Sequence, residues 1–333
     1  IKVKVRIEDA QVIVDFTGTS ETASGPINVP LPGTFACVEL AFRSIFVPFE
    51  PPNAGHSRAL KIIAPENTLT NPSSPAPCDS YGYAQYTIVD LVNECLANAV
   101  PNRCPAGGYQ LCGLYFYRGD SSYGEPFIYF DAFRGGGGAL PSDDGADAVI
   151  FWDGGDAPLI PIEVIEPRFP IRVERHELHG AEYGSGKYRG GLGVIREFRI
   201  LTDNVFMQTF NEQTLYPSHG LFGGRDGGIT RVIARPGTDE EEVVPSRISF
   251  YGPLHSGEVV RAYVAGGAGY GDSLERDPER VLWEVLNDIL TIDKASEIYG
   301  VTITPGTEGD PSVDYEATNT HRAKRRRVKQ NGR

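Results

Sequence analysis

The sequence has few of the features that mark secreted, zinc-binding or membrane proteins. Cysteine occurs five times in 333 residues, an odd number, and no two cysteines stand as Cys-x-x-Cys, which argues against a disulfide framework and a zinc knuckle. No apolar run approaches the roughly 18 residues that a membrane-spanning helix needs, and no signal segment opens the chain. We therefore expect a cytoplasmic protein whose thiols are free and mostly fill the core.

Methionine is almost absent. Met207 is the only one, and the chain opens on Ile1, so either an upstream segment has been removed or the chain is a piece of a longer polypeptide. In both cases the missing part could carry chemistry of its own. Glycine and proline, by contrast, number 39 and 25, which indicates many turns and short elements rather than long helices.

Positive charge is scarce outside the C-terminal end. The net charge is -13, and residues 321–333 hold seven Lys and Arg with no acid, so residues 1–320 carry -20. A body this acidic repels nucleic-acid phosphates, and we expect neither a nucleic-acid nor a membrane partner. The basic end is predicted to be a solvated, disordered terminus, with an address signal or an arm for an acidic partner as alternatives.

The periodicity of apolar residues predicts an α+β fold, β-rich, with mostly antiparallel short strands. Residues 1–16 alternate apolar and polar positions around a turn, which is typical of a hairpin. Helical spacing appears near 33–47, 81–100 and 277–299, and residues 109–264 contain many short strands with β-branched and aromatic residues. Because no alternating βαβ rhythm appears, a Rossmann-type sheet is not expected.

The same pattern predicts three parts along the chain. Residues 1–108 form an N-terminal α+β part, residues 109–301 a β-rich C-terminal part, and residues 302–333 a polar tail with a basic end.

Glycine-rich stretches raise the question of nucleotide binding. Gly135–Gly138 follows a predicted strand, but the next residues include a proline and paired acids and do not begin a helix that could bind a phosphate. The stretch at 180–191 has Ala181 where a Walker loop needs glycine and Tyr188 where it needs Ser or Thr. We predict no cofactor-binding residues in this chain. Four glycines let the backbone pass close to another layer or to a ligand, and we favour packing.

Histidines and acids supply a few candidates for metal or acid–base chemistry. His176 and His179 lie on a predicted strand, where residues three apart point to opposite faces, so we do not expect them to share a metal. The acid-rich loop around Asp144 is either a cation site or a solvated turn. Glu163 and Glu166 are predicted at the end of a strand.

An ordered series of motifs makes the chain recognisable. It resembles the hydantoinase B/oxoprolinase family, the B-type subunits of ATP-dependent N-methylhydantoinases, 5-oxoprolinases, and acetone and acetophenone carboxylases, from about Val3 to Val301. The motifs are DFTGTS at 15–20, GPIN at 25–28, PPNAG at 51–55, LKIIAPENTLTNP at 60–72, GGGG at 135–138, IEVIE at 162–166, GKYRGGLGVIREFRI at 186–200 and GGAGYGDSLERDPERV at 266–281.

The resemblance implies a division of labour between polypeptides. An A-type, hydantoinase A-like subunit would bind ATP and Mg and phosphorylate the carbonyl or enol oxygen of a small-molecule substrate. Family members of the B type are longer upstream, which implies that an upstream B-type segment or chain accompanies this one and holds any divalent metal site. The metal itself is not predicted from this sequence.

The B-type part would shield the phosphorylated intermediate from water and offer polar groups to it. The candidate catalytic residues lie in the motif loops, together with the backbone of Gly135–Gly138, and a turn-holding role is the alternative for each. They are Asp15, Asn28, Asn53, Asp144 and Glu163.

Three functions stay open. The first is ATP-dependent hydrolysis of a cyclic amide such as a hydantoin or 5-oxoproline. Two stretches depart from the pattern of the amide-hydrolysing relatives, IFWDGGDAPLIPIE at 150–163 and QTFNEQTLYPSHG at 208–220, and they keep ATP-dependent ketone carboxylation as the second. The third is a non-catalytic scaffold chain of such a complex.

Overall fold

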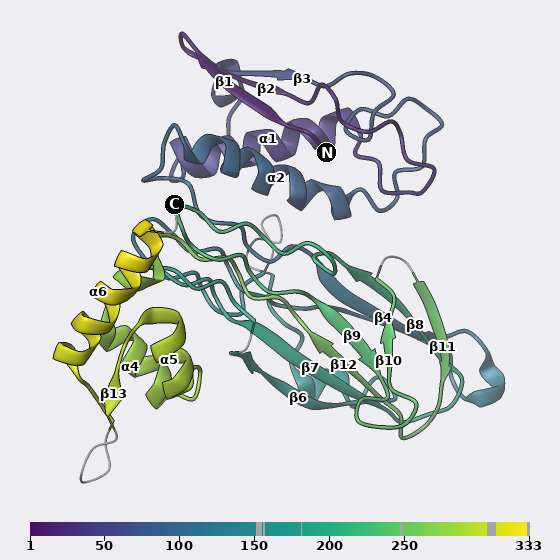
Figure 1. The fold of residues 1–333 in the computed structure, drawn as a ribbon. Helices are drawn as coiled ribbons and strands as arrows, with labels where there is room; N and C mark the ends of the chain where they lie inside the picture. The colour runs from purple at the N-terminus through teal and green to yellow at the C-terminus, as the bar shows by residue number, and fades with distance from the viewer. Residues whose placement is uncertain (151–154, 156, 181, 247–248, 305–310, 332–333) are drawn as a thin grey trace.

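The chain forms an N-terminal unit, a central β-sandwich and a C-terminal group of helices, joined by a bundle of glycine-rich segments (Figure 1). The computed structural model describes residues 1–150, 155, 157–180, 182–246, 249–304 and 311–331. Part of the unusual stretch at 150–163 therefore lies outside the described residues. Helices and mostly antiparallel strands occupy separate parts of the chain, so the predicted α+β class is confirmed.

In the N-terminal unit a small sheet lies against two helices (Figure 1). The predicted hairpin forms, and a third strand pairs with it in parallel. Val14 of the sheet and Val38 and Ile88 of the helices are fully buried between the layers. The elements are β1 (Lys4–Glu8), β2 (Gln11–Asp15), α1 (Leu31–Phe46), the short 3-10 helix η1 (His56–Ala59), β3 (Leu60–Ile63) and α2 (Gly82–Ala97).

The central part is a sandwich of two antiparallel sheets. A five-stranded sheet has the order β10-β9-β12-β7-β6, and a four-stranded sheet has the order β11-β8-β4-β5. The elements are β4 (Cys112–Arg118), η2 (Ser121–Tyr123), β5 (Phe127–Ala132), β6 (Ile171–His179), β7 (Gly193–Ile200), β8 (Val205–Asn211), β9 (Arg231–Ala234), β10 (Glu242–Val244), β11 (Ser249–Leu254) and β12 (Val259–Tyr263).

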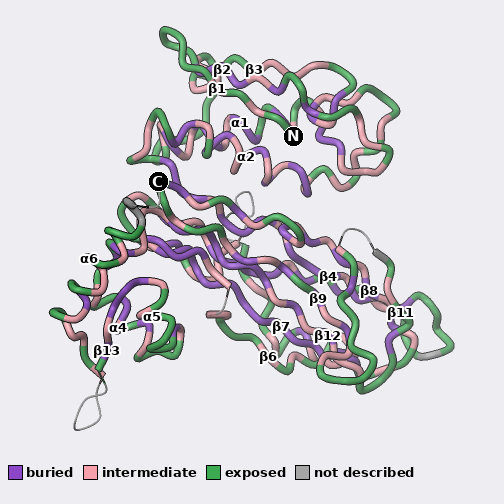
Figure 2. The backbone as a smooth tube through the Cα atoms, in the orientation of Figure 1, coloured by how far each residue is buried: buried purple, intermediate pink, exposed green. Residues whose placement is uncertain are grey.

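Alternation along the strands separates the interior of the sandwich from its outer face. In β8, Val205 and Met207 are fully buried while Phe206 is partly exposed, as expected for a strand with one solvated face. The buried positions are continuous between the two sheets (Figure 2). The outer face of the four-stranded sheet is aromatic, with Tyr117 stacked on Phe206 at 5.9 Å between ring centroids.

Glycine-rich segments connect the sandwich with the N-terminal unit. They come from about 104–109, 135–148, 182–192, 218–228 and 265–271, and bond to one another through their backbones. Gly137 receives a hydrogen bond from Gly191 (2.8 Å), and Gly191 receives one from Gly267 (2.9 Å). A Cβ on Gly136 would lie 1.9 Å from the carbonyl oxygen of Gly191. The glycines are therefore required for close backbone packing, which is the interpretation favoured from the sequence.

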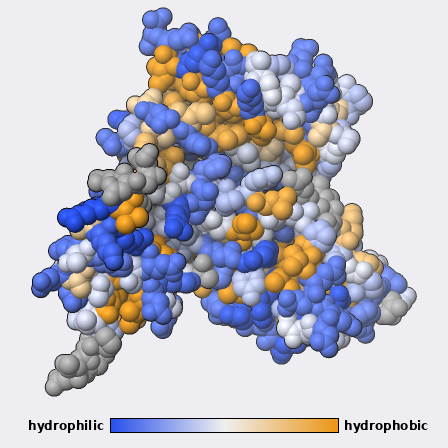
Figure 3. Space-filling view, viewed as in Figure 1, coloured by the Kyte–Doolittle hydropathy of each residue, from blue (hydrophilic) through white to orange (hydrophobic). Residues whose placement is uncertain are grey.

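The predicted helices near 277–299 form as α4 and α5, and a further helix, α6, occupies most of the tail whose basic end was predicted to be disordered. Arg322 of α6 donates to the carbonyl oxygens of Tyr299 (2.9 Å) and Arg276 (2.7 Å), and Arg326 donates to that of Leu274 (3.1 Å). Arginines thus pair with carbonyl oxygens at or near helix ends, although the outer surface of α6 stays hydrophilic (Figure 3). The elements are η3 (Ser273–Glu275), α4 (Pro278–Leu286), α5 (Ile292–Tyr299), β13 (Ile303–Thr304), β14 (Ser312–Val313) and α6 (Tyr315–Asn331).

One predicted strand is wrong. Instead of a strand, residues 162–165 form a short helix, α3 (Ile162–Ile165), because the carbonyl oxygen of Pro161 at its N-cap accepts hydrogen bonds from the N–H groups of Val164 and Ile165. Only Ile165 of this helix is fully buried.

The five cysteines all lie within the described residues. All five cysteines are free, and burial raises the pKa of the Cys104 thiol to about 11, so this thiol stays protonated and unreactive. Within the described residues no helix has the length and apolar character to traverse a lipid bilayer.

Candidate functional site

Asn28 holds a loop of the N-terminal unit. Its side chain is fully buried, and Nδ2 donates to the carbonyl oxygens of Ala23 (2.9 Å), Gly25 (3.1 Å) and Pro77 (2.9 Å). Oδ1 accepts from the N–H of Ala23 at 2.7 Å. Because every polar atom of this amide is engaged, the structure supports a turn-holding role for Asn28.

Asp15 and Asn53 also support local turns. Asp15 accepts from the N–H of Thr17 at 2.9 Å, and the hydrogen bonds to Thr17 lower its pKa. Asn53 is exposed and accepts from the N–H of Gly55 at 2.9 Å. These bonds are typical of Asx turns.

Asp144 belongs to a buried cluster of arginines and carboxylates between the bundle and α4. Arg276 donates to Asp144 (2.7 and 2.8 Å) and to Glu284 (2.7 Å), and Arg189 donates to Asp147 (2.8 Å) and to Glu284 (2.7 Å). Arg276 and Glu284 are each 1% exposed. We call these five residues the arginine–carboxylate cluster, and it joins the bundle to α4.

Charge within the cluster shifts its pKa values in opposite directions. Burial works to raise the pKa of Asp144, but the hydrogen bonds and charge of Arg276, with the N–H of Arg189, outweigh burial and lower it. Burial raises the pKa of Glu284 in spite of the two guanidinium groups beside it. The partly exposed carboxylate therefore holds its charge more firmly than the sealed one.

Glu163 lies apart from the other candidates. It is exposed in the first turn of α3, a short helix before β6. The five predicted catalytic residues thus come from a hairpin end, two loops of the N-terminal unit, the cluster at α4 and an exposed helix, and the structure does not bring them together in one site.

The strand β6 carries two histidines. His176 and His179 lie there as predicted, and His179 packs against Tyr263 of β12 with ring centroids 5.4 Å apart. Burial lowers the pKa of both imidazoles. Over the described residues, no group of three or more His, Cys, Asp or Glu side chains is arranged to hold a metal ion.

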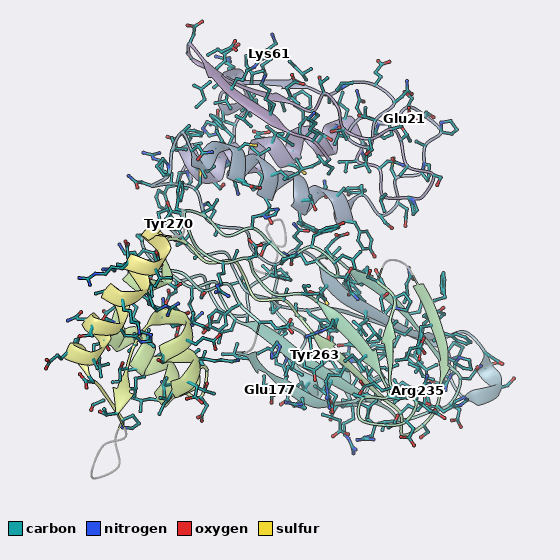
Figure 4. All side chains as sticks on the ribbon, viewed as in Figure 1. Glu21, Lys61, Glu177, Arg235, Tyr263 and Tyr270 are labelled. Atoms are coloured by element: carbon teal, nitrogen blue, oxygen red, sulfur yellow. The ribbon has the colours of Figure 1, made fainter. Side chains whose placement is uncertain are left out.

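A cavity of about 350 Å³ lies where α2 meets the glycine-rich bundle, and we call it the junction cavity. One wall is the face of α2 from Thr87 to Glu94, another is the segment from Pro105 to Gln110, and the third is the loop from Glu212 to Leu221. Ile1 completes the lining. Tyr270 links the glycine-rich bundle to the segment that follows α2, because its hydroxyl donates to the carbonyl oxygen of Pro101 at 2.7 Å (Figure 4).

Two glutamines fix the geometry of this cavity. Gln110 donates from Nε2 to Asp90 at 3.2 Å and accepts at Oε1 from Thr87 at 3.2 Å. Gln213 accepts from the N–H of Gln110 (2.9 Å) and donates to the carbonyl oxygen of Gly108 (3.0 Å). Helix, bundle and loop are therefore held by hydrogen bonds in and around the lining, which preorganise the cavity.

Two other polar side chains in the lining lack partners. Asn93 is 2% exposed and Ser218 is 4% exposed, and neither the amide atoms of Asn93 nor the hydroxyl oxygen of Ser218 has a hydrogen-bond partner among the described residues. Neither residue was predicted from the sequence. The available signal was a polar residue, Asn93, within the apolar pattern of a predicted helix.

The junction cavity is also acidic. Asp90, Glu94 and Glu212 line it, and His219 is the one basic side chain in the described lining. The arrangement can bind a small molecule that forms hydrogen bonds and carries no negative charge.

Comparisons with known proteins place the chain in context. The family model described as "Hydantoinase B/oxoprolinase" matches residues 1–273. The B-type subunit of a "Putative D-/L-hydantoinase" from Pseudomonas sp. (strain NS671) is 35% identical over 329 residues, covering 96% of this chain and 54% of that protein. The chain spans about half the length of the curated relatives it matches.

Two solved structures share the fold. The nucleotide-free structure of acetone carboxylase superposes with a TM-score of 0.81 at 18% identity, over 99% of this chain and 48% of that chain. The ATP-dependent caprolactamase from Pseudomonas jessenii superposes with a TM-score of 0.79 at 23% identity, over 96% of this chain and 56% of that chain.

Proposed function

The chain belongs to the hydantoinase B/oxoprolinase family, and we propose that it forms part of a B-type subunit of an ATP-dependent enzyme that hydrolyses a cyclic amide. The relative with 35% identity carries the name of a hydantoinase subunit. The single structural observation that supports this proposal is the junction cavity, a small chamber of about 350 Å³ at the meeting point of two structural units.

ATP is assigned to a partner because the glycine-rich segments here do not fit a phosphate. Added volume on Gly136 or Gly191 meets backbone oxygen at 1.9 or 2.0 Å, so these loops are filled by their own backbone and are not an open anion cradle. We propose that ATP and Mg are bound by an A-type subunit, which supplies the phosphoryl group. A phosphorylated amide oxygen turns a poor electrophile into a reactive one, which offsets the poor leaving ability of amide nitrogen.

The residues of this chain would act by binding and by excluding water. The junction cavity would enclose the ring, and the hydrogen-bonded glutamines Gln110 and Gln213 would hold its walls in place. The acids of the lining would disfavour an anionic substrate, and the negative charge of the transferred phosphoryl group would be met by the ATP site of the partner subunit.

The test is ATP turnover by the complete enzyme, purified with its partner chains. We expect hydantoin or a lactam to stimulate ATP hydrolysis with release of the ring-opened product. The second candidate, ketone carboxylation, is favoured by the fold shared with acetone carboxylase, and it predicts stimulation by acetone or acetophenone with bicarbonate instead. No stimulation by any of these compounds would reject both functions.

A scaffold role makes a different prediction. If this chain only stabilises a catalytic partner, Asn93→Leu and Glu163→Ala leave turnover of the complete enzyme unchanged. A tenfold loss of kcat/KM in folded Asn93→Leu enzyme, about 1.4 kcal/mol in the barrier, would reject the scaffold role. Glu163→Ala tests the remaining exposed candidate, and because Glu163 is outside the lining of the junction cavity, we expect it to leave turnover unchanged.

A further inference from the structure

The outer face of the four-stranded sheet is aromatic and uncharged. Alternation along β4, β5 and β8 turns every second side chain away from the interior of the sandwich. Within these three strands, which the structure describes in full, none of the outward side chains is charged. We call this surface, together with the outward ring of β11, the aromatic face. Its six aromatic residues are Tyr115, Tyr117, Phe130, Phe206, Phe210 and Phe250.

Ring contacts make the aromatic face continuous. Tyr115 of β4 pairs with Phe130 of β5, and their rings stack with centroids 4.7 Å apart. The ring of Phe210 lies 5.4 Å from that of Tyr115 and 5.2 Å from that of Phe130. Tyr117 contacts Phe250 of β11 at 6.2 Å. The rings therefore extend from β5, one edge strand of the sheet, to β11, the other.

Much of the aromatic face is open. Phe250 is 71% exposed and Phe130 is 41% exposed. Ile128, which pairs with Tyr117 and extends the face at the β5 edge, is 70% exposed. Single exposed apolar residues need no explanation, but a contiguous apolar patch on a protein surface marks a site of interaction. The aromatic face is therefore a docking surface by its composition and exposure.

The outer face of the five-stranded sheet provides an internal comparison. There Arg172 and Arg199 both donate to Glu174, at 2.8 and 2.6 Å, and Arg261 donates to Glu197. Ion pairs are compatible with a face that stays in water. The two outer faces of one sandwich thus differ in charge, so the lack of charge on the aromatic face is not a requirement of the sandwich itself.

The composition of the aromatic face indicates a permanent partner. The buried centre of a protein interface is depleted of charged residues and enriched in aromatic ones, and permanent interfaces are more hydrophobic than transient ones. A permanent partner also protects the edge strands β5 and β11 from pairing with other chains. A partner that associates and dissociates in each catalytic cycle would leave this apolar surface open to water.

The relatives contain a candidate for such a partner. The chain corresponds to 54% of the hydantoinase subunit and to 48% of the acetone carboxylase chain, so about half of each of those polypeptides lies outside the matched part. We call the corresponding part of the B-type polypeptide the remaining half. Two parts of one subunit stay together permanently, which is the kind of association that the aromatic face favours.

The position of Ile1 is compatible with this partner. Ile1 and Tyr83 line one small cavity, and Tyr83 also lines a groove that contains Tyr115 and Phe210 of the aromatic face. A segment joined to Ile1 would therefore run close to the aromatic face and could reach it without crossing the molecule.

We propose that the aromatic face is the docking surface for the remaining half of the B-type polypeptide. That half presents apolar side chains to the rings and hydrogen-bond partners to the hydroxyls of Tyr115 and Tyr117. The proposal concerns the assembly of the subunit, and it does not depend on which reaction the complete enzyme performs.

Photocrosslinking identifies what covers the aromatic face. The experiment uses the complete enzyme, purified with its partner chains, in which p-benzoylphenylalanine replaces either Phe250 at one edge of the face or Ile128 at the other. We expect the main crosslinked peptide at both positions, identified by mass spectrometry, to belong to the remaining half, in the same chain or in a separate one. A main crosslink to the A-type subunit or to a second copy of residues 1–333, or no crosslink, overturns the proposal.

A charge placed on the aromatic face tests the same contact without a probe. Ile128→Lys would put an ammonium group under the remaining half, and Val243→Lys makes a matched change on β10 of the other sheet, where Val243 is 59% exposed. We expect the Tm of the complete enzyme to fall by at least about 5 °C in Ile128→Lys and by less than about 1 °C in Val243→Lys. Equal Tm values for the two variants overturn the proposal, and if Ile128→Lys does not assemble, the crosslinks decide.

Discussion

Arg276 and Asp144 form two parallel hydrogen bonds, Nη1 to Oδ1 at 2.7 Å and Nη2 to Oδ2 at 2.8 Å, between positions 132 residues apart. Arg276 precedes α4, and Asp144 follows the run of four glycines in the bundle. The pair therefore links the C-terminal helices to the packing centre of the molecule. Bidentate pairing of this kind is geometrically specific.

Removal of Arg276 should destabilise the protein strongly. Arg276→Ala removes the buried guanidinium that Asp144 and Glu284 share and leaves Glu284 with Arg189 alone, and we expect a loss of about 3–5 kcal/mol in the free energy of unfolding, measured by urea denaturation. The matched control is Arg172→Ala, because Arg172 also bonds to an acid, Glu174 at 2.8 Å, but at the surface and outside the cluster. That change should cost less than about 1 kcal/mol, and similar losses in both variants would contradict a structural role for the cluster.

Alanine at Gly136 should prevent the bundle from forming. Its Cβ would lie 1.9 Å from the carbonyl oxygen of Gly191 and 2.3 Å from the backbone nitrogen of Gly267, and backbone atoms on both sides cannot move away independently. We expect insoluble or unfolded Gly136→Ala protein by circular dichroism. Gly119→Ala, where a Cβ meets nothing within 4 Å, should fold normally. A folded Gly136→Ala variant would show that the bundle tolerates local expansion.

Asn28 and Asn53 should respond differently to alanine. Asn28→Ala removes four buried hydrogen bonds and leaves carbonyl groups unpaired, so we expect about 3 kcal/mol of destabilisation. Asn53 is exposed, and Asn53→Ala should change stability by less than about 1 kcal/mol. Thermal melts of both variants decide the matter, and equal Tm values would argue against the turn-holding role of Asn28.

Stability should decrease as the pH falls below the ordinary pKa of histidine. Burial holds the pKa of His179 below its usual value of 6.5, and nearby Arg231 and Arg175 act in the same direction against Glu182 and Glu177. The unfolded chain then takes up a proton near pH 6.5 that the folded chain does not, so this contribution is present above pH 6.5 and is lost as the pH falls from there to the folded-state pKa.

Denaturation curves from pH 7.5 to 5.5 measure this dependence. His179→Gln should give a flatter profile over that range, and His176→Gln should act in the same direction because burial also lowers the pKa of His176. A wild-type profile unchanged by both substitutions would show that other groups control the dependence.

Local patterns were sufficient for most elements. The hairpin of β1 and β2, the helices α1 and α2, and the caps of α4 and α5 all follow from neighbouring residues: Asp277 caps α4 with Pro278 at its first position, and Gly300 ends α5 with φ at 62°. The strand expected at α3 and the disorder expected of α6 were wrong. In α6 the deciding contacts, from Arg322 and Arg326 to distant carbonyl groups, are not visible in a local window.

The candidate site, too, could not be predicted from a local window of sequence. Loop motifs drew attention to Asn28, Asn53 and Asp144, yet each is occupied by hydrogen bonds within the protein. No motif pointed to Asn93, because a single polar residue in an apolar helix pattern does not indicate a function until its surroundings are known. Its importance depends on atoms from three separate segments that meet around it without satisfying it.

The sequence by itself determined the family, the α+β class and the position of most helices and strands, since capping, periodicity and motif order are properties of neighbouring residues. Only the tertiary structure decided which polar groups are satisfied and which are left unpaired at a cavity. A hydrogen bond between residues far apart in the chain forms only if its donor and acceptor are placed to within a few tenths of an ångström. That placement is reached only once the glycine-rich backbones have packed together.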